Sequence, residues 1–268
     1  MTAAFARSVP RSGSMGFTVA RAFALIFVVL GLSEALFFGI AGWLDAATLE
    51  SLFPGAAPHR LHGITLGIIS GVLVLCIVVQ LWDPRQHLAA ALLGVVALSS
   101  YTLGALPSGT LDPLALVGLA IVAAMAWLHP ARGGAEFMPL NPLAIVSAVP
   151  LLIGVAVFAG TELQAQVTAA AADEHAQFGH YALMAATAVT VAGAAVIGSS
   201  SLRGAWLAGW LGVGAALAFG VASIVYPTSV SSVGVAPGVT LIVLASAFGA
   251  GLVATRHRVQ RSVEAMAN

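Results

Sequence analysis

Long apolar stretches separated by short polar breaks run along the chain from about residue 21 to residue 255. A hydrocarbon layer about 30 Å thick is crossed by roughly 20 mainly apolar residues of helix. Each break contains charged residues, proline or glycine, which are typical of the ends of helices and of turns. The pattern therefore predicts eight transmembrane segments, at residues 21–43, 61–82, 86–106, 112–129, 142–161, 178–200, 204–226 and 236–255.

These segments are expected to be helices, because a helix satisfies its own backbone hydrogen bonds within lipid and an open strand does not. The alternation of polar and apolar residues that marks a membrane β-barrel is absent from the sequence. The fold class predicted is thus an all-α integral membrane protein.

The arginines lie almost entirely on one side of this predicted bundle. With a cytoplasmic N-terminus, nine of the ten arginines fall in cytoplasmic segments and Arg60 alone falls outside. Because basic residues concentrate on the cytoplasmic side of membrane proteins, both termini are expected in the cytoplasm. A multi-pass location in the cytoplasmic (inner) membrane follows, with the loops 44–60 and 162–177 on the outer face.

A shift of 118 residues aligns the first four predicted segments with the last four. It places His62 on His180, and six of the fourteen positions in residues 85–98 match their counterparts in residues 203–216. Since four segments return the chain to the same side, the halves would be parallel repeats about an axis along the membrane normal. The alternative is coincidence in a sequence rich in Ala, Gly, Leu and Val.

The repeat divides the chain into five parts. These are a cytoplasmic N-terminal lead (1–20), a first four-helix repeat (21–132), a cytoplasmic linker (133–141), a second four-helix repeat (142–255) and a cytoplasmic tail (256–268).

Composition narrows the functional classes. Apolar residues make up 60% of the chain and charged residues 7%, with a mean hydropathy of +1.01, whereas a soluble domain has about 25% charged residues. Acidic and basic residues balance at ten each, so no basic surface is available for nucleic acid. The absence of lysine excludes a Schiff-base cofactor, and the single cysteine, Cys76, excludes an internal disulfide or a paired-cysteine metal site.

Four of the seven histidines lie at the predicted outer face. His59 and His62 form the motif HRLH at the start of the second segment, and His175 and His180 lie in DEHAQFGHY at the start of the sixth. Neutral imidazole is the commonest metal ligand and also an axial heme ligand. All four are therefore candidate metal ligands; the plainer interpretation is that histidine is tolerated where helices meet water. The other three, His87, His129 and His257, are expected at the cytoplasmic interface.

Glu34 lies well inside the first predicted segment, among apolar neighbours. A carboxylate at that depth is costly unless it faces the bundle interior, so Glu34 is the candidate catalytic residue, its alternative being a neutral hydrogen bond to another helix. Arg60 can bind an anionic group, such as a propionate, a lipid phosphate or the Glu34 carboxylate.

Two short motifs, HRLHG at 59–63 and QFGHY at 177–181, lie at the outer starts of the second and sixth segments. Together with the topology they resemble the heme A synthase family, eight-span membrane proteins built from two four-helix halves. The resemblance implies that His62 and His180 take heme- or substrate-facing positions and that Gln177 takes the glutamine of the family's second motif.

The sequence also departs from that family. His59 stands at the place of the family's glutamate, and Gly63 and Tyr181 stand at the places of its arginines. The opposing histidines of the fourth and eighth segments and the outer-loop cysteine pair are missing. The resemblance therefore favours a heme-binding relative over a heme A synthase.

Three functional hypotheses follow. The first is a heme or transition-metal site near the outer face, in a subunit or assembly factor of a membrane redox complex. The second is a small-solute or ion transporter that uses Glu34 and the exofacial histidines. The third is a structural membrane subunit with no site. The expected partners are the lipid bilayer and other membrane subunits, and nucleic acid is not among them.

Overall fold

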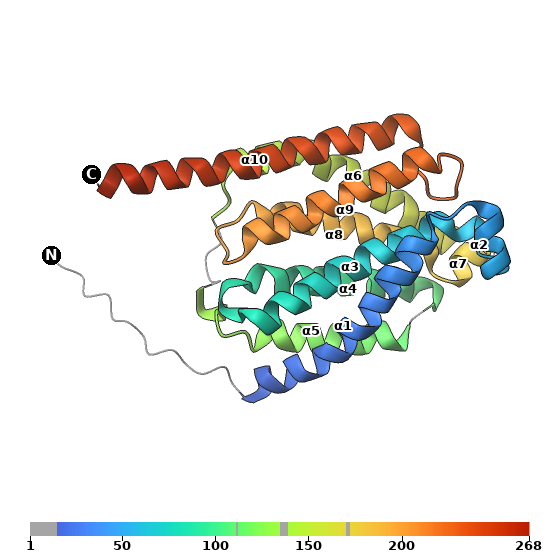
Figure 1. Cartoon of the computed structure of the whole chain (residues 1–268), viewed down its shortest axis with the longest axis horizontal. Helices are drawn as coiled ribbons and strands as arrows, with labels where there is room; N and C mark the ends of the chain where they lie inside the picture. Colours follow the sequence, from blue (N-terminus) through green and yellow to red (C-terminus); the bar gives the residue numbers. More distant parts are fainter. Residues whose placement is uncertain (1–14, 111, 135–138, 170–171, 268) are drawn as a thin grey trace.

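The computed structural model describes residues 15–110, 112–134, 139–169 and 172–267, and within them it is all-α (Figure 1). Seven of its helices are long and apolar enough to cross a membrane. They are α1 (Met15–Ala41), α3 (Arg60–Trp82), α4 (Leu88–Ala105), α6 (Pro142–Thr168), α8 (His180–Gly198), α9 (Ala205–Val225) and α10 (Val235–Ala267). The chain is therefore a multi-span membrane protein.

The remaining helices are shorter. The predicted segment 112–129 corresponds to α5 (Pro113–Trp127), whose 15 residues extend about 22 Å at 1.5 Å per residue. Asp112 caps its first turn by accepting a hydrogen bond from the Leu114 amide at 2.8 Å, and Pro113 follows at the first helical position. Two short helices, α2 (Ala46–Leu52) and α7 (Glu174–Gln177), lie in the connections before α3 and α8. One-turn 3-10 helices occur at η1 (Ala57–His59), η2 (Pro84–Gln86), η3 (Leu106–Ser108) and η4 (Arg132–Gly134).

Several helix ends differ from the sequence prediction. The first helix begins at Met15, inside the expected lead 1–20, of which residues 1–14 lie outside the described part. The last helix continues through the expected tail to Ala267. Of the expected linker 133–141, residues 135–138 also lie outside the described part.

The end of α6 corrects the prediction that residues 162–177 form a loop, because the helix continues to Thr168. No proline or glycine interrupts it after Gly160, and its polar residues have partners. Gln166 donates to the Ala176 carbonyl at 2.8 Å and accepts from the Ala182 amide at 3.0 Å. These two bonds tie the last turn of α6 to the α7–α8 connection, which compensates the burial of the polar side chain.

The helices form two groups of four that pack against each other (Figure 1). In the first group α1 packs on α3, α3 on α4, α4 on α5 and α5 on α1; in the second group α6, α8, α9 and α10 pack in the same cyclic order. The groups meet through α3 and α4 on one side and α8 and α9 on the other. The start of α1 and the end of α10 lie at one end of the bundle, and α2 and α7 lie at the other.

Helices α1 and α3 approach closely at a pair of glycines. A Cβ atom added to Gly67 would lie 2.3 Å from the Cα of Gly39, which is closer than two non-bonded carbon atoms can approach. Gly71, one turn further along α3, has no heavy atom within 4 Å of such a Cβ. The backbone contact at Gly67 therefore depends on the absence of a side chain, as in other small-residue helix interfaces of membranes.

We expect Gly67→Val to lower the free energy of unfolding by about 1–3 kcal/mol, because the added side chain forces α1 away from α3. Gly71→Val is the matched control and is expected to cost less than about 1 kcal/mol. Denaturation of both variants in detergent, followed by circular dichroism, measures the difference. Equal losses would mean that the two helices do not pack closely at Gly39.

A buried polar group closes the end of the bundle opposite α2 and α7. His129 lies beyond the last residue of α5, outside the membrane-spanning helices, and it is 3% exposed. Its Nδ1 accepts from the Ala131 amide at 3.1 Å, so its Nε2 carries the hydrogen and donates to Gln80 Oε1 at 3.0 Å. Gln80 in turn donates to the His87 carbonyl at 2.6 Å. His129 is thus a buried connector between α3 and the loop that follows α5, and its place at the cytoplasmic membrane interface stays a prediction.

This burial makes stability depend on pH. Burial lowers the pKa of the His129 imidazole to about 4, against 6.5 for a free histidine. Between pH 4 and pH 6.5 the imidazole is therefore mostly protonated in the unfolded chain and mostly neutral in the folded chain. As the pH falls from about 6.5 to about 4, this residue should cost at most about 3 kcal/mol of stability.

The His129→Gln variant should lack that part of the pH dependence while sharing the contributions of the other histidines. Thermal unfolding of both proteins in detergent from pH 4 to pH 7 tests this expectation. Identical pH profiles would contradict it.

Candidate metal site

The first two histidines of the site lie where the α2–α3 connection enters the bundle. Ala57 begins the 3-10 turn η1, Pro58 follows, His59 ends the turn, and α3 starts at the next residue. His62 follows in the first turn of α3 and is 2% exposed. The two imidazoles thus come from one short stretch, with ring centroids 6.3 Å apart.

The second two histidines come from the α7–α8 connection. The side chain of Asp173 caps α7 by accepting from the His175 amide at 2.8 Å. Gly179 then has a φ of +69°, a left-handed conformation that favours glycine, and α8 begins at His180. This turn places His175 and His180 on the same side, with ring centroids 5.6 Å apart.

The fold brings the two pairs together at the end of the bundle that carries α2 and α7. Each of the four histidines offers a ring nitrogen, and these nitrogens all lie within 4.8 Å of one another. His62 and His180 are stacked, with centroids 4.6 Å apart and planes 18° apart. The four histidines that the sequence offers as candidate metal ligands therefore form one cluster.

Most of these ring nitrogens lack a partner. Both nitrogens of His62, together with His59 Nδ1, His175 Nε2 and His180 Nδ1, are buried and accept or donate no hydrogen bond among the described residues. A buried polar atom without a partner is uncommon in native proteins. A single metal ion could bind one such nitrogen from each of the four histidines.

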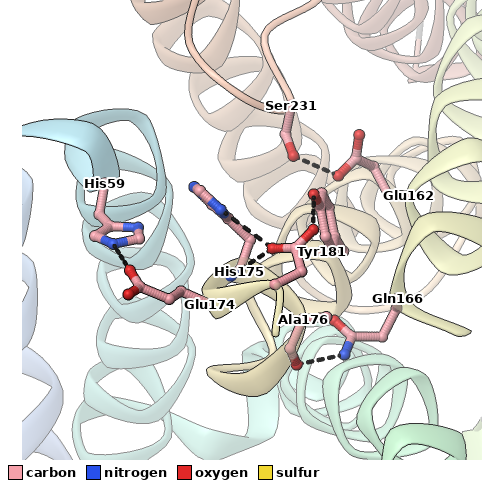
Figure 2. A network of polar contacts seen from close by, with 9 residues as sticks. His59, Glu162, Gln166, Glu174, His175, Ala176, Tyr181 and Ser231 are labelled. Carbon is pink, nitrogen blue, oxygen red and sulfur yellow. Dashed lines mark hydrogen bonds and ion pairs between the residues drawn. The ribbon is translucent and has the colours of Figure 1, made fainter. Parts of the chain in front are cut away.

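Two acidic residues lie against the outer nitrogens of the cluster. Glu174 Oε2 lies 3.8 Å from His59 Nε2 (Figure 2). Asp173 Oδ1 lies 3.4 Å from His175 Nδ1. Asp173 also accepts from the Tyr181 hydroxyl at 3.1 Å. Burial alone would raise the pKa of Asp173, but hydrogen bonds from the His175 amide and from Tyr181 hold it below its usual value. The carboxylate beside His175 is therefore ionised at neutral pH.

A buried acid, Glu162, also lies in this region and was not identified in the sequence. Glu162 of α6 is 7% exposed and accepts a hydrogen bond from Ser231 at 2.6 Å (Figure 2). Ser231 adopts a φ of +64°, in the loop between α9 and α10. Glu162 and Gln166 are one helical turn apart on the inner face of α6; this spacing, together with the lack of a helix breaker, was the available signal.

Arg60 binds other parts of the protein and so has a structural role. Its guanidinium donates to the carbonyls of Gly42 and Leu44, just after the end of α1, and to the Tyr226 hydroxyl at 2.7 Å. It also lies 4.2 Å from the centre of the Tyr226 ring. Arg60 thus ties the end of α1 to the end of α9 beside the histidine cluster and does not pair with Glu34.

Glu34 faces into the bundle, as the sequence predicts, and its partner comes from the second predicted segment. Ser70 of α3 donates to Glu34 Oε2 at 2.9 Å. The carboxylate lines a cavity of about 130 Å³ that also touches Tyr101. Glu34 is therefore a part of the interior but not a member of the histidine cluster. Gln177, at the end of α7, is exposed and is not part of that cluster either.

A larger cavity of about 300 Å³ adjoins the cluster. His59, His62 and His180 line it, and most of its other walls are apolar or aromatic side chains of α1, α2 and α3. It shares Leu66, Tyr101 and Leu183 with the smaller cavity beside Glu34. The histidine cluster is thus reached from an apolar space inside the bundle.

Comparison of the chain with protein families, with curated proteins and with solved structures finds no match. The long apolar helices and the convergence of the histidines show a multi-span, all-α membrane protein with a four-histidine cluster that could hold a metal ion.

Proposed function

We propose that this membrane protein binds one transition-metal ion through His59, His62, His175 and His180. The observation that carries the proposal is the convergence of four imidazoles whose buried nitrogens have no other partner among the described residues. Solvation explains a single histidine at a helix end, but it does not explain four that face one another instead of water.

The surrounding contacts suggest which nitrogens bind the ion. His175 Nδ1 faces Asp173, which leaves its buried Nε2 for the metal; His59 Nε2 faces Glu174, which leaves its buried Nδ1. A carboxylate on the outer nitrogen of a ligating histidine fixes the tautomer and raises the basicity of the ligand. The two carboxylates also supply negative charge against a divalent cation held by neutral imidazoles.

The spacing favours a single small ion over heme. A tetrahedral ion with metal–nitrogen bonds of about 2.0–2.1 Å holds its ligand nitrogens about 3.4 Å apart, so modest side-chain rotations from the observed 4.8 Å close the site. A heme held by His62 and His180 would need the two rings on opposite faces of the macrocycle. Stacked at 4.6 Å, these rings leave no room for a third plane between them. Imidazole ligands suit zinc, copper, iron and nickel ions.

The membrane placement is part of the same proposal. With the arginine-rich ends of the helices in the cytoplasm, the histidine cluster lies at the outer face of the cytoplasmic membrane, with α5 as an eighth, short span. The identical order of helix packing in the two groups of four supports a duplication with His62 and His180 as repeat-related ligands.

Metal analysis and an absorbance spectrum of the detergent-purified protein test the proposal together. One zinc, copper, iron or nickel ion per chain, without the intense visible band of heme, is the expected result. A heme band at one heme per chain would show that the histidines bind heme and not a single metal ion. If neither heme nor metal is found, even after loading with each metal, the proposed site is wrong.

Transport is a second candidate, favoured by the position of Glu34. Its cavity shares three lining residues with the cavity beside the histidines, so Glu34 and the histidine cluster lie on neighbouring cavities. Transport predicts metal uptake into proteoliposomes that is coupled to a pH gradient. It also predicts that Glu34→Gln lowers the uptake about tenfold or more while metal binding stays within about twofold. Uptake unaffected by this variant would leave Glu34 as a packing residue hydrogen-bonded to Ser70.

A further inference from the structure

We infer that the cavity of about 300 Å³ beside the histidines binds a phenol-class molecule, an apolar aromatic ring with one oxygen that ligates the metal. This inference rests on the proposed metal site and names the class of ligand for it. It concerns binding at the metal and involves no covalent step.

The cavity approaches the cluster from one side. His59, His62 and His180 line it, whereas His175 does not. A molecule in the cavity can therefore contact three of the four proposed ligands and approach the ion from a side that His175 does not line. Zinc-like ions accept a fifth ligand when one is presented to them, so one oxygen of the occupant can coordinate without displacing a histidine.

The walls select an aromatic occupant. Phe37 meets Phe38 edge-to-face at 5.1 Å between ring centroids and meets Phe53 edge-to-face at 4.9 Å. All three rings line the cavity, as does Phe178. Aromatic rings prefer edge-to-face and offset contacts with other rings. A flat ring of the occupant can therefore continue the packing that the phenylalanines already make.

Charge in the cavity also disfavours an ionic occupant. Among the described residues that line the cavity, Arg60 supplies the only guanidinium, and it is already engaged by two backbone carbonyls and the Tyr226 hydroxyl. None of these described lining residues carries a carboxylate. A neutral molecule with a weakly acidic oxygen meets these conditions, because the metal supplies the one strong polar contact.

The route of entry is from the membrane side of α1. Phe37 and Phe38 are 47% and 41% exposed, and Phe178 is 64% exposed, although all three line the cavity. Such apolar surface, at the end of a membrane-spanning helix, faces lipid. A lipid-soluble quinol and a small water-soluble phenol share the required chemistry, and the length of the apolar tail distinguishes these sources.

The test uses the full chain in detergent, loaded with Co²⁺, whose visible bands report its coordination. We expect 4-octylphenol to shift the Co²⁺ bands in a saturable way, and phenol without a tail to do so at least tenfold more weakly if the ligand comes from the membrane. Equal affinities of the two probes would indicate a water-soluble source. Either result supports the inference.

Gly63 offers a way to fill the cavity without touching the ligands. It lines the cavity, and a Cβ there would meet only the Phe38 carbonyl, at an ordinary 3.6 Å. We expect Gly63→Leu to bind Co²⁺ like the wild type but to bind 4-octylphenol at least tenfold more weakly. Gly71→Leu, on the same helix with open space around it, is the matched control and should bind both normally. Leu66→Phe, which narrows the same cavity, replaces Gly63→Leu if that variant does not fold.

The outcomes separate the two proposals. If Co²⁺ does not bind to the wild type, the metal site fails and this inference fails with it. If Co²⁺ binds but neither phenol alters its bands, or if the filled variants bind the probe as tightly as the wild type, the metal site stands and the phenol site is overturned.

Discussion

Replacing His62 by alanine is expected to abolish tight metal binding, with a loss of affinity greater than about 100-fold. His62 is the most buried of the four histidines, and both of its ring nitrogens are unpartnered. The loss of a residue that only supports a ligand typically costs 10–100-fold in affinity, so the loss of a ligand itself should exceed that range. Competition for Zn²⁺ against a chromophoric chelator, in detergent, measures the change.

His257→Ala is the control for this prediction. His257 is exposed in the C-terminal part of α10, and this end of the helix lies opposite α2 and α7 (Figure 1). Its removal should therefore leave the affinity for Zn²⁺ within about twofold of the wild type. A His62→Ala protein that binds Zn²⁺ as tightly as the wild type would remove His62 from the site.

Stability separates the loss of the ligand from a failure to fold. Without metal, His62→Ala loses packing but also removes two buried nitrogens that have no partner, and these effects oppose each other. With metal at 100 times its dissociation constant, the wild type gains about 2.7 kcal/mol that the variant lacks. The melting temperature of the wild type should therefore rise on adding Zn²⁺ and fall with a chelator, while that of the variant should respond to neither.

The sequence predicts the helices because lipid imposes a simple requirement on it. Backbone groups within hydrocarbon must bond internally, so hydropathy and helix breakers suffice to locate seven long helices. The requirement weakens at the ends of the bundle. There Gln166 and Glu162 extend α6 beyond its apolar part because Ala182 of α8 and Ser231 of the α9–α10 loop supply their partners. Hydropathy carries no information about those partners.

The candidate site was predictable in part for the same reason. The four histidines stand in two short motifs at equivalent helix starts, so topology alone brings them to one end. The partner of Glu34 and the role of Arg60 depend on which faces of the helices meet. Ser70 and Tyr226, their hydrogen-bond partners, lie 36 and 166 residues away along the chain. No local pattern marks them.

The carboxylate of Asp173 provides the second large effect, and Asp173→Asn is expected to weaken metal binding by about 10–100-fold. Asparagine caps a helix about as well as aspartate, so the start of α7 should remain intact. What is lost is the negative charge that lies 3.4 Å from His175 Nδ1. Without it, His175 is held less firmly with Nε2 toward the ion, and its nitrogen is a weaker donor to the metal.

Asp45→Asn is the matched control for that variant. Asp45 caps α2 by accepting from the Thr48 amide at 2.9 Å, and hydrogen bonds from Thr48 hold the pKa of its carboxyl below the usual value. This variant therefore loses a capping charge at the same end of the bundle, in a residue whose side chain bonds to Thr48 and not to the four histidines. The affinity of Asp45→Asn for Zn²⁺, measured by the same chelator competition, should match the wild type.

If both variants weaken binding equally, the effect of Asp173 is general electrostatics at this end of the protein. If neither does, the His175–Asp173 contact has no part in holding the ion, and the assignment of Nε2 as the ligand atom loses its support.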